Sequence, residues 1–187
     1  MKYSRPMESV SARIVGSLGG RRWGWTQSLG AGGLLLQSHD NTRLVVTNEH
    51  LEPLMELDIP ASAGGPHAVS EDLSRVALSL RDEVRLVDSA GRTVGRFPHE
   101  PWEWSTGACA FDHGGGHLWA TIPANGELHL VVLRLDDLQE VDRRGLESDG
   151  AGNPLHHPDR RTIGWSIGGA RTALYTGGRA WTNNEWI

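Results

Sequence analysis

The sequence has few of the residues that cross-link small proteins or bind nucleic acid. Cys109 is its single cysteine, which by itself forms neither an internal disulfide nor a zinc cluster. Lys2 is its only lysine, and 18 basic against 23 acidic side chains leave a formal charge of −5. This balance is the opposite of the basic surface that phosphate backbones require, so we expect no nucleic-acid partner.

Long apolar stretches are missing as well. No run approaches the roughly 20 apolar residues of a membrane span, and residues 1–20 contain no apolar run of seven or more. Aromatic residues make up only 6% of the 187 residues, whereas 38% hydrophobic and 22% charged residues are typical of one globular domain. These features favour a soluble cytoplasmic protein that makes no contact with a membrane.

Glycine and a sequence repeat are what the chain does contain. Its 24 glycines and nine prolines, with few runs of helical periodicity, favour short strands joined by turns. Four apolar segments that begin at Leu34, Val76, Leu118 and Ile163 start 42, 42 and 45 residues apart. This spacing is typical of a four-stranded propeller blade. We therefore predict an all-β fold, a β-propeller of four-stranded antiparallel blades with about four blades present.

Each repeat supplies candidates for the strands of one blade. Short strands that end in an acid-containing turn precede three of the apolar segments, and an aspartate can hold such a turn through backbone amides. Alternation along the strands predicts the buried core. The blades are predicted at about 24–57, 67–97, 108–143 and 153–176 within one domain, 1–187. The core is predicted at Val76, Leu78, Val84, Leu86, Leu118, Ala120, Leu128, Leu130 and Val132.

Two of the turns resemble a known family. His157–Ile163 and, more loosely, Ser70–Val76 are similar to the turn between the first and second strands of bacterial WD-repeat-like β-propellers. The resemblance covers about residues 24–176 and implies a propeller scaffold without a particular activity. No Trp-Asp dipeptide ends a blade, and the one Gly-His pair, Gly116-His117, does not precede a first strand. The buried His, Asp and Trp network of eukaryotic WD repeats is therefore not expected.

Two arrangements of the repeats are open. Residues 13–18 match residues 92–97 at Arg, Val and Gly. They would close a four-bladed ring if they supplied the fourth strand of the blade at 153–176, because closure removes exposed sheet edges. Alternatively, the chain is a truncated arc of a six- to eight-bladed propeller. We favour the arc, which fits the irregular tail predicted at 177–187.

Two motifs suggest a serine hydrolase. The sequence Gly164-Trp165-Ser166-Ile167-Gly168 matches a nucleophile elbow and resembles prolyl-oligopeptidase-type peptidases. The stretch 113–116 matches the His-Gly-Gly-Gly that supplies oxyanion amides. The hydrolase order requires an acid and then a histidine after the nucleophile, but the 21 residues after Ser166 contain neither Asp nor His. Because the motifs also fall on a predicted strand and a predicted turn, we expect no catalytic residue.

Pairs of histidines and aspartates are candidate metal ligands. His113 and His117 are four residues apart, which on a helix would place two imidazoles on one face, but the three glycines between them disfavour a helix. The pair at 156–157 fits a strand end, and the aspartates at 136–137 fit a hairpin turn. We therefore predict no metal site and no cofactor.

One propeller face is the predicted binding site. Loops that join second to third strands, and loops that join one blade to the next, share a face around the central channel. Tryptophans flanked by acids and histidines at 99–104 are typical of interface anchors, although such rings also pack between blades. The predicted binding residues are His39, Asp40, His67, Arg81, Asp82, His99, Glu100, Trp102, Glu103 and Trp104, with Asn41, Glu83, Asn125 and Glu127 on the same face.

These features predict a non-enzymatic scaffold or binding module for a protein, a peptide or a small polar ligand. The acidic surround favours a basic peptide or a polar ligand over a phosphate. Two alternatives remain open. One is the propeller part of a serine hydrolase or peptidase, and the other is a lactonase-like propeller whose channel acids hold Ca²⁺.

Overall fold

Every regular element in the described part of the chain is a β-strand. The computed structural model describes residues 23–28, 33–38, 40, 42–63, 65–103, 107–146, 153–156, 162–167, 171–176 and 179–183, with side chains described for those between 33 and 146. These residues form sixteen strands. Within these ranges, no helix is long and apolar enough to cross a membrane.

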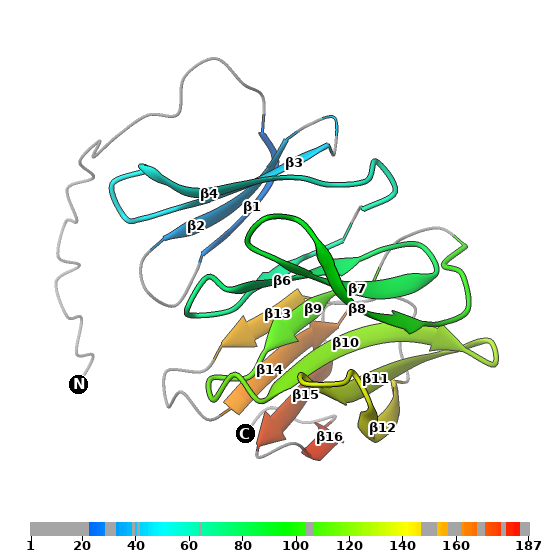
Figure 1. The fold of residues 1–187 in the computed structure, drawn as a ribbon. Helices are drawn as coiled ribbons and strands as arrows, with labels where there is room; N and C mark the ends of the chain where they lie inside the picture. Colours follow the sequence, from blue (N-terminus) through cyan, green and yellow to red (C-terminus); the bar gives the residue numbers. More distant parts are fainter. Residues whose placement is uncertain are drawn as a thin grey trace, which may run out of the picture.

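The strands form four sheets of four, each antiparallel and ordered along the chain (Figure 1). The first two sheets are β1 (Trp23–Ser28), β2 (Leu34–Ser38), β3 (Arg43–Thr47), β4 (Pro53–Asp58), and β5 (Ala68–Val69), β6 (Arg75–Ser79), β7 (Glu83–Asp88), β8 (Thr93–Pro98). The last two are β9 (Cys109–Phe111), β10 (His117–Ala124), β11 (Glu127–Arg134), β12 (Glu140–Leu146), and β13 (Asn153–His156), β14 (Thr162–Ile167), β15 (Arg171–Thr176), β16 (Arg179–Asn183).

The sheets are the predicted blades, and the fold class predicted from the repeat is confirmed. The segments that begin at Leu34, Val76, Leu118 and Ile163 all lie on second strands. The main difference is at the end of the chain, where β16 pairs with β15 inside the tail predicted to be irregular. Ring closure would have made residues 13–18 the outer strand of the last blade. In the structure β16 is that outer strand. Residues 13–18 lie outside the described residues.

The core lies between successive blades. One cluster joins the first and second blades through residues that include Leu35, Leu44 and Val76, and another joins the second and third through residues that include Leu86 and Leu118. The strands β6 and β10 are buried on both faces, because the second and third blades each have a neighbouring blade on either side. The predicted core is confirmed except at Leu128, which is only partly buried.

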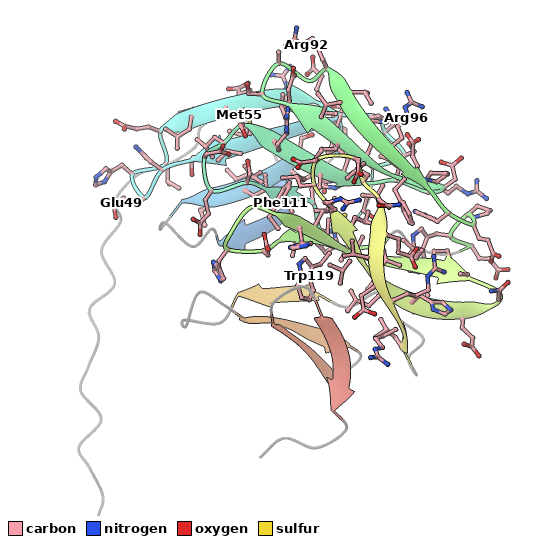
Figure 2. The ribbon with its side chains drawn as sticks, turned by 60° about the horizontal axis from the view of Figure 1, so that its bottom comes forward. Glu49, Met55, Arg92, Arg96, Phe111 and Trp119 are labelled. Atoms are coloured by element: carbon pink, nitrogen blue, oxygen red, sulfur yellow. The ribbon has the colours of Figure 1, made fainter. Side chains whose placement is uncertain are left out.

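Side chains in Figure 2 follow this pattern. Phe111 and Trp119 lie among the sheets, and Trp119 is on the side of the third blade that faces β13–β16. Glu49 and Arg92 project outward from the turns that precede β4 and β8. The stack therefore has a dry interior between blades and a charged outer rim.

The turns before the outer strands pack one blade on the next. Gly91 has φ +77° and lies close to Leu57, since a Cβ at Gly91 would be 3.7 Å from a methyl of Leu57. Leu138 takes the equivalent place in the third blade with φ 53°, and its Cδ1 is 2.7 Å from where a Cβ of Gly95 would be. Each such turn thus contacts the outer strand of the preceding blade, and at Gly95 the absence of a side chain makes room for it.

A β-bulge recurs in the outer strands β4, β8 and β12. The pairing skips Leu54, Val94 and Val141 in these three strands. The same three residues are the exposed large hydrophobic side chains of the described region, at 53%, 47% and 45%. Bulges twist edge strands and hinder pairing with another chain, so the rim is protected at the same place in each of these blades.

Candidate binding face at the hairpin ends

The segment that leaves β8 crosses the hairpin ends of two blades. Its His99 N–H donates to the carbonyl of Asp82 at 3.0 Å, and its Trp102 N–H donates to the carbonyl of Arg81 at 2.8 Å. Farther on, the Asn125 N–H of the next blade donates to the Glu100 carboxylate at 3.1 Å. We call residues 99–103 the strap. These bonds fix the strap across the β6–β7 and β10–β11 hairpins.

Trp102 does not serve as an exposed anchor on this face. Its side chain is buried at 6% exposure, and its Cζ2 lies 3.0 Å from where a Cβ of Gly107 would be. The His99 ring meets the indole edge-on at a centroid distance of 6.5 Å. Packing between blades is therefore the role of Trp102, and the prediction that it contacts a partner directly is wrong for this conformation. Trp104 lies outside the described residues.

His67 is also enclosed rather than presented. It precedes β5, is fully buried, and accepts a hydrogen bond at Nδ1 from the Ser79 N–H at 3.3 Å. Burial without a counter-charge lowers the pKa of His67 to about 4. The side chain is therefore neutral at pH 7 and is not exposed on the face, contrary to the prediction.

Asp40 stabilises a turn through bonds that recur at Asp72. The Asp40 carboxylate accepts from the Ser38 and Thr42 hydroxyls at 2.6 and 2.8 Å and from the Thr42 N–H at 3.2 Å. Asp72 accepts equivalent bonds within the Ser70–Arg75 turn, at 2.7 to 3.0 Å. Hydrogen bonds lower the pKa of each carboxylate to about 2. The largest contribution comes from the Ser38 hydroxyl at Asp40 and from the Ser70 hydroxyl at Asp72. The Asp72 turn confirms the predicted role of its acid. His39 and Asn41 lie outside the described residues.

Acid should destabilise the fold in two stages. Unfolded His67 takes up a proton near its ordinary pKa of 6.5, but folded His67 does so only near pKa 4, so stability falls as the pH drops between these values, by up to about 3 kcal/mol. A further loss follows between pH 4 and 2, where Asp40 and Asp72 are ionised only in the folded state. Urea unfolding at pH 7, 5 and 3 tests this, with His67→Phe expected to flatten the upper stage. Equal stability at pH 7 and 5 would contradict the burial of His67.

The side chains that remain exposed are mostly acidic. Arg81 is the cation, and the carboxylates are Asp82, Glu100, Glu103 and Glu127. His99 is half-buried, and burial is the main cause that lowers its pKa. Its Nδ1 donates to the Glu100 carbonyl at 2.6 Å, because a carbonyl oxygen can only accept. We call this set the hairpin face: Arg81, Asp82, His99, Glu100, Glu103, Asn125 and Glu127.

The hydrolase motifs lie in ordinary propeller elements. Ser166 is on β14, paired with Asn153 and Thr172 on both sides, so it is not at a sharp strand-to-helix turn. His113 is in the β9–β10 turn, where Nδ1 lies 3.3 Å from the Glu71 carboxylate of the preceding blade. Cys109 is fully buried, and burial raises the pKa of its thiol to about 12, which leaves it unreactive. The described residues contain no group of three or more His, Cys, Asp or Glu side chains placed to hold a metal ion.

Comparison with known proteins shows the fold class of the chain. No family model and no curated protein matches the sequence. Solved structures of β-propeller proteins do match, which shows that the chain has a propeller fold. One is BamB from Moraxella catarrhalis, with a TM-score of 0.55 and 12% identity over 95% of this chain and 51% of that one.

Two further structures give the same result. A protein from Lactobacillus plantarum matches with a TM-score of 0.57 and 14% identity, over 88% of this chain and 55% of that one. Hydrazine synthase from Kuenenia stuttgartiensis matches with a TM-score of 0.56 and 12% identity, over 97% and 53%. The chain thus spans about half the length of each of these proteins. At such low identity the likeness concerns the fold.

Proposed function

We propose that this chain is a non-enzymatic propeller module that binds a basic peptide segment of a partner protein on the hairpin face. The observation that carries the proposal is the anchored strap, which holds Glu100 and Glu103 on the surface while its tryptophan is packed inside. A fixed loop loses little conformational freedom on binding, so it can present charges at low entropic cost. The scaffold behind it is made of rigid sheets.

The charge balance of the hairpin face sets the kind of partner. One arginine lies among four exposed carboxylates, and none of these carboxylates belongs to a described metal-binding group. Such a surface attracts lysine and arginine side chains and repels phosphate. We place this activity in the cytoplasm of a bacterium, among WD-repeat-like propellers. The resemblance of Ser70–Val76 to that family's turn is what supports this placement.

Neutralising the strap should weaken binding of a basic peptide. The variant Glu100→Gln/Glu103→Gln removes two negative charges and keeps an oxygen that can accept the bond from Asn125. We expect the Kd of a fluorescein-labelled octalysine peptide to rise about fivefold at about 0.1 M salt, since exposed ion pairs contribute up to about 1 kcal/mol in total here. Fluorescence anisotropy measures it.

A control with the same charge change separates the face from the net charge. Glu49→Gln/Asp136→Gln removes two exposed acids from the turns before β4 and β12. These turns lie at the ends of the strands opposite to the hairpin face. We expect this variant to bind octalysine within about twofold of the parent protein, in keeping with charge screening over a Debye length of about 10 Å. Equal weakening by both pairs would show that only the overall charge matters and would overturn the proposal.

A further inference from the structure

The charge of the chain is divided unevenly along the sequence. Residues 1–22 carry five basic side chains and one acid, a formal charge of +4, whereas residues 23–187 carry 13 basic and 22 acidic side chains, a charge of −9. A terminal block of one sign beside a domain of the other sign is typical of a segment that makes its own electrostatic contact. We call residues 1–22 the basic segment. Its cations are Lys2, Arg5, Arg13, Arg21 and Arg22.

The backbone joins the basic segment to the fold at the hairpin end of the first blade. β1 is antiparallel to β2, and its first residue, Trp23, pairs with Ser38, the last residue of β2. Ser38 leads into the β2–β3 hairpin, which is the first blade's equivalent of the β6–β7 and β10–β11 hairpins. Arg21 and Arg22 directly precede Trp23, so the sequence places two cations next to the end of the molecule that carries the hairpin face.

The basic segment is long enough to reach the strap. Neighbouring sheets pack about 10 Å apart, so the hairpins of the second and third blades lie about 10 and 20 Å from that of the first. An extended chain of 22 residues spans up to about 70 Å. β16 is the outer strand of the last blade, so that blade does not require residues 13–18 as a strand.

Exposed acids lie between the first blade and the strap. Asp40 is in the β2–β3 turn, and Asp58, the last residue of β4, is exposed at the same end of the blade beside its ion-pair partner Arg43. Asp82 follows at the β6–β7 hairpin and Glu100 on the strap. A basic chain that leaves the first blade in this direction would therefore meet carboxylates along its path.

The chain's own face is favoured over a separate polyanion such as a nucleic acid. The acidic residues near the point of attachment would repel phosphates, because residues 23–187 carry a charge of −9. A short tether also holds a group at an effective concentration of about 1 mM, so a contact with a Kd of about 0.1 mM would be occupied about nine-tenths of the time.

We propose that the basic segment docks on the hairpin face of its own chain, where its arginines pair with the carboxylates of Asp82, Glu100 and Glu103. This inference rests on the proposed function, because it uses the same acids. It adds regulation to that function, since a partner's basic peptide must displace the basic segment before it binds.

A spin label on the basic segment tests where the segment lies. Cys109 is fully buried, so a nitroxide reagent attaches to the new thiol of Ala12→Cys in the full chain. We expect the label to weaken the amide signals of Asn125 and Gly126, at the β10–β11 hairpin, at least about twofold relative to the chemically reduced label. The amide signal of Gly115, in the turn at the other end of β10, should keep its intensity.

Neutralising the acids of the strap should release the segment. In the labelled chain, Glu100→Gln/Glu103→Gln is expected to restore the Asn125 signal, whereas the control pair Glu49→Gln/Asp136→Gln should leave it weakened. Full signals in the labelled chain, or equal recovery with both pairs, would overturn the inference. A mixture of spin-labelled chain with isotope-labelled chain that carries no nitroxide tests for contact between copies. Weakened signals in that mixture would show docking on a second copy and would contradict docking within one chain.

The results separate this inference from the proposed function. If the segment stays off the face while Glu100→Gln/Glu103→Gln still weakens octalysine binding, the inference fails and the proposed function stands. If that pair neither releases the segment nor changes octalysine binding, both fail.

Discussion

Gly107→Ala is expected to destabilise the protein by at least about 3 kcal/mol, enough to leave little folded protein if the parent has ordinary stability. The added Cβ would lie 2.1 Å from the backbone carbonyl oxygen of Thr121, and 3.0 Å from both Ser79 Oγ and Trp102 Cζ2. The carbonyl cannot move freely, because Thr121 and Ala108 are joined by two hydrogen bonds, at 3.0 and 2.9 Å. Urea unfolding measures the loss.

Gly116→Ala is the matched control. A Cβ at Gly116 would have nothing within 4 Å and its φ is not in the left-handed region. The same chemical change should therefore be neutral or stabilise by up to about 1 kcal/mol through the unfolded chain. If Gly107→Ala unfolds at the same urea concentration as Gly116→Ala, the close packing of the strap against the third blade is wrong.

Leu86→Asp should abolish folding rather than alter binding alone. Leu86 is 2% exposed and belongs to the cluster that joins the second and third blades. A carboxylate there would be buried without a partner, which together with the lost apolar contacts costs about 4 kcal/mol or more. Soluble expression and circular dichroism melting measure the effect.

Val94→Asp provides the comparison for Leu86→Asp. Val94 is the skipped residue of the β8 bulge and is 47% exposed, so an aspartate there remains hydrated. We expect a change within about 0.5 kcal/mol. A cooperative melt for Leu86→Asp at the temperature of Val94→Asp would remove the assignment of β7 to the core.

The sequence pattern was sufficient to predict the sheets. The starting points of the second strands predicted the elements, and the alternation predicted one buried face of each strand. In β6 and β10 the second face is buried as well, because these strands lie between two neighbouring blades. The turn at Asp72 was also predictable, since its acid bonds amides only a few residues away. Local chemistry and a regular period carried these predictions.

The binding face was harder to predict because it depends on contacts between repeats. Trp102 stands between Pro101 and Glu103, as a surface residue could, yet it packs where a Cβ of Gly107 in the next blade would lie. His67 bonds Ser79 across its own blade, a contact that its sequence neighbours do not indicate. Asp40 was assigned to the face, although the pattern Ser-x-Asp-x-(Thr or Ser)-Arg, which residues 38–43 share with residues 70–75, could have shown its role in the turn.

Packing of one repeat on the next is the central claim, and nuclear Overhauser effects between Leu138 and Gly95 test it most directly. The propeller arrangement predicts strong signals from a Leu138 methyl group to the Gly95 Hα protons, since that methyl lies 2.7 Å from where a Gly95 side chain would begin. Their absence, with Leu138 in contact only with residues of its own sheet, would contradict the side-by-side stacking on which the strap and the hairpin face depend.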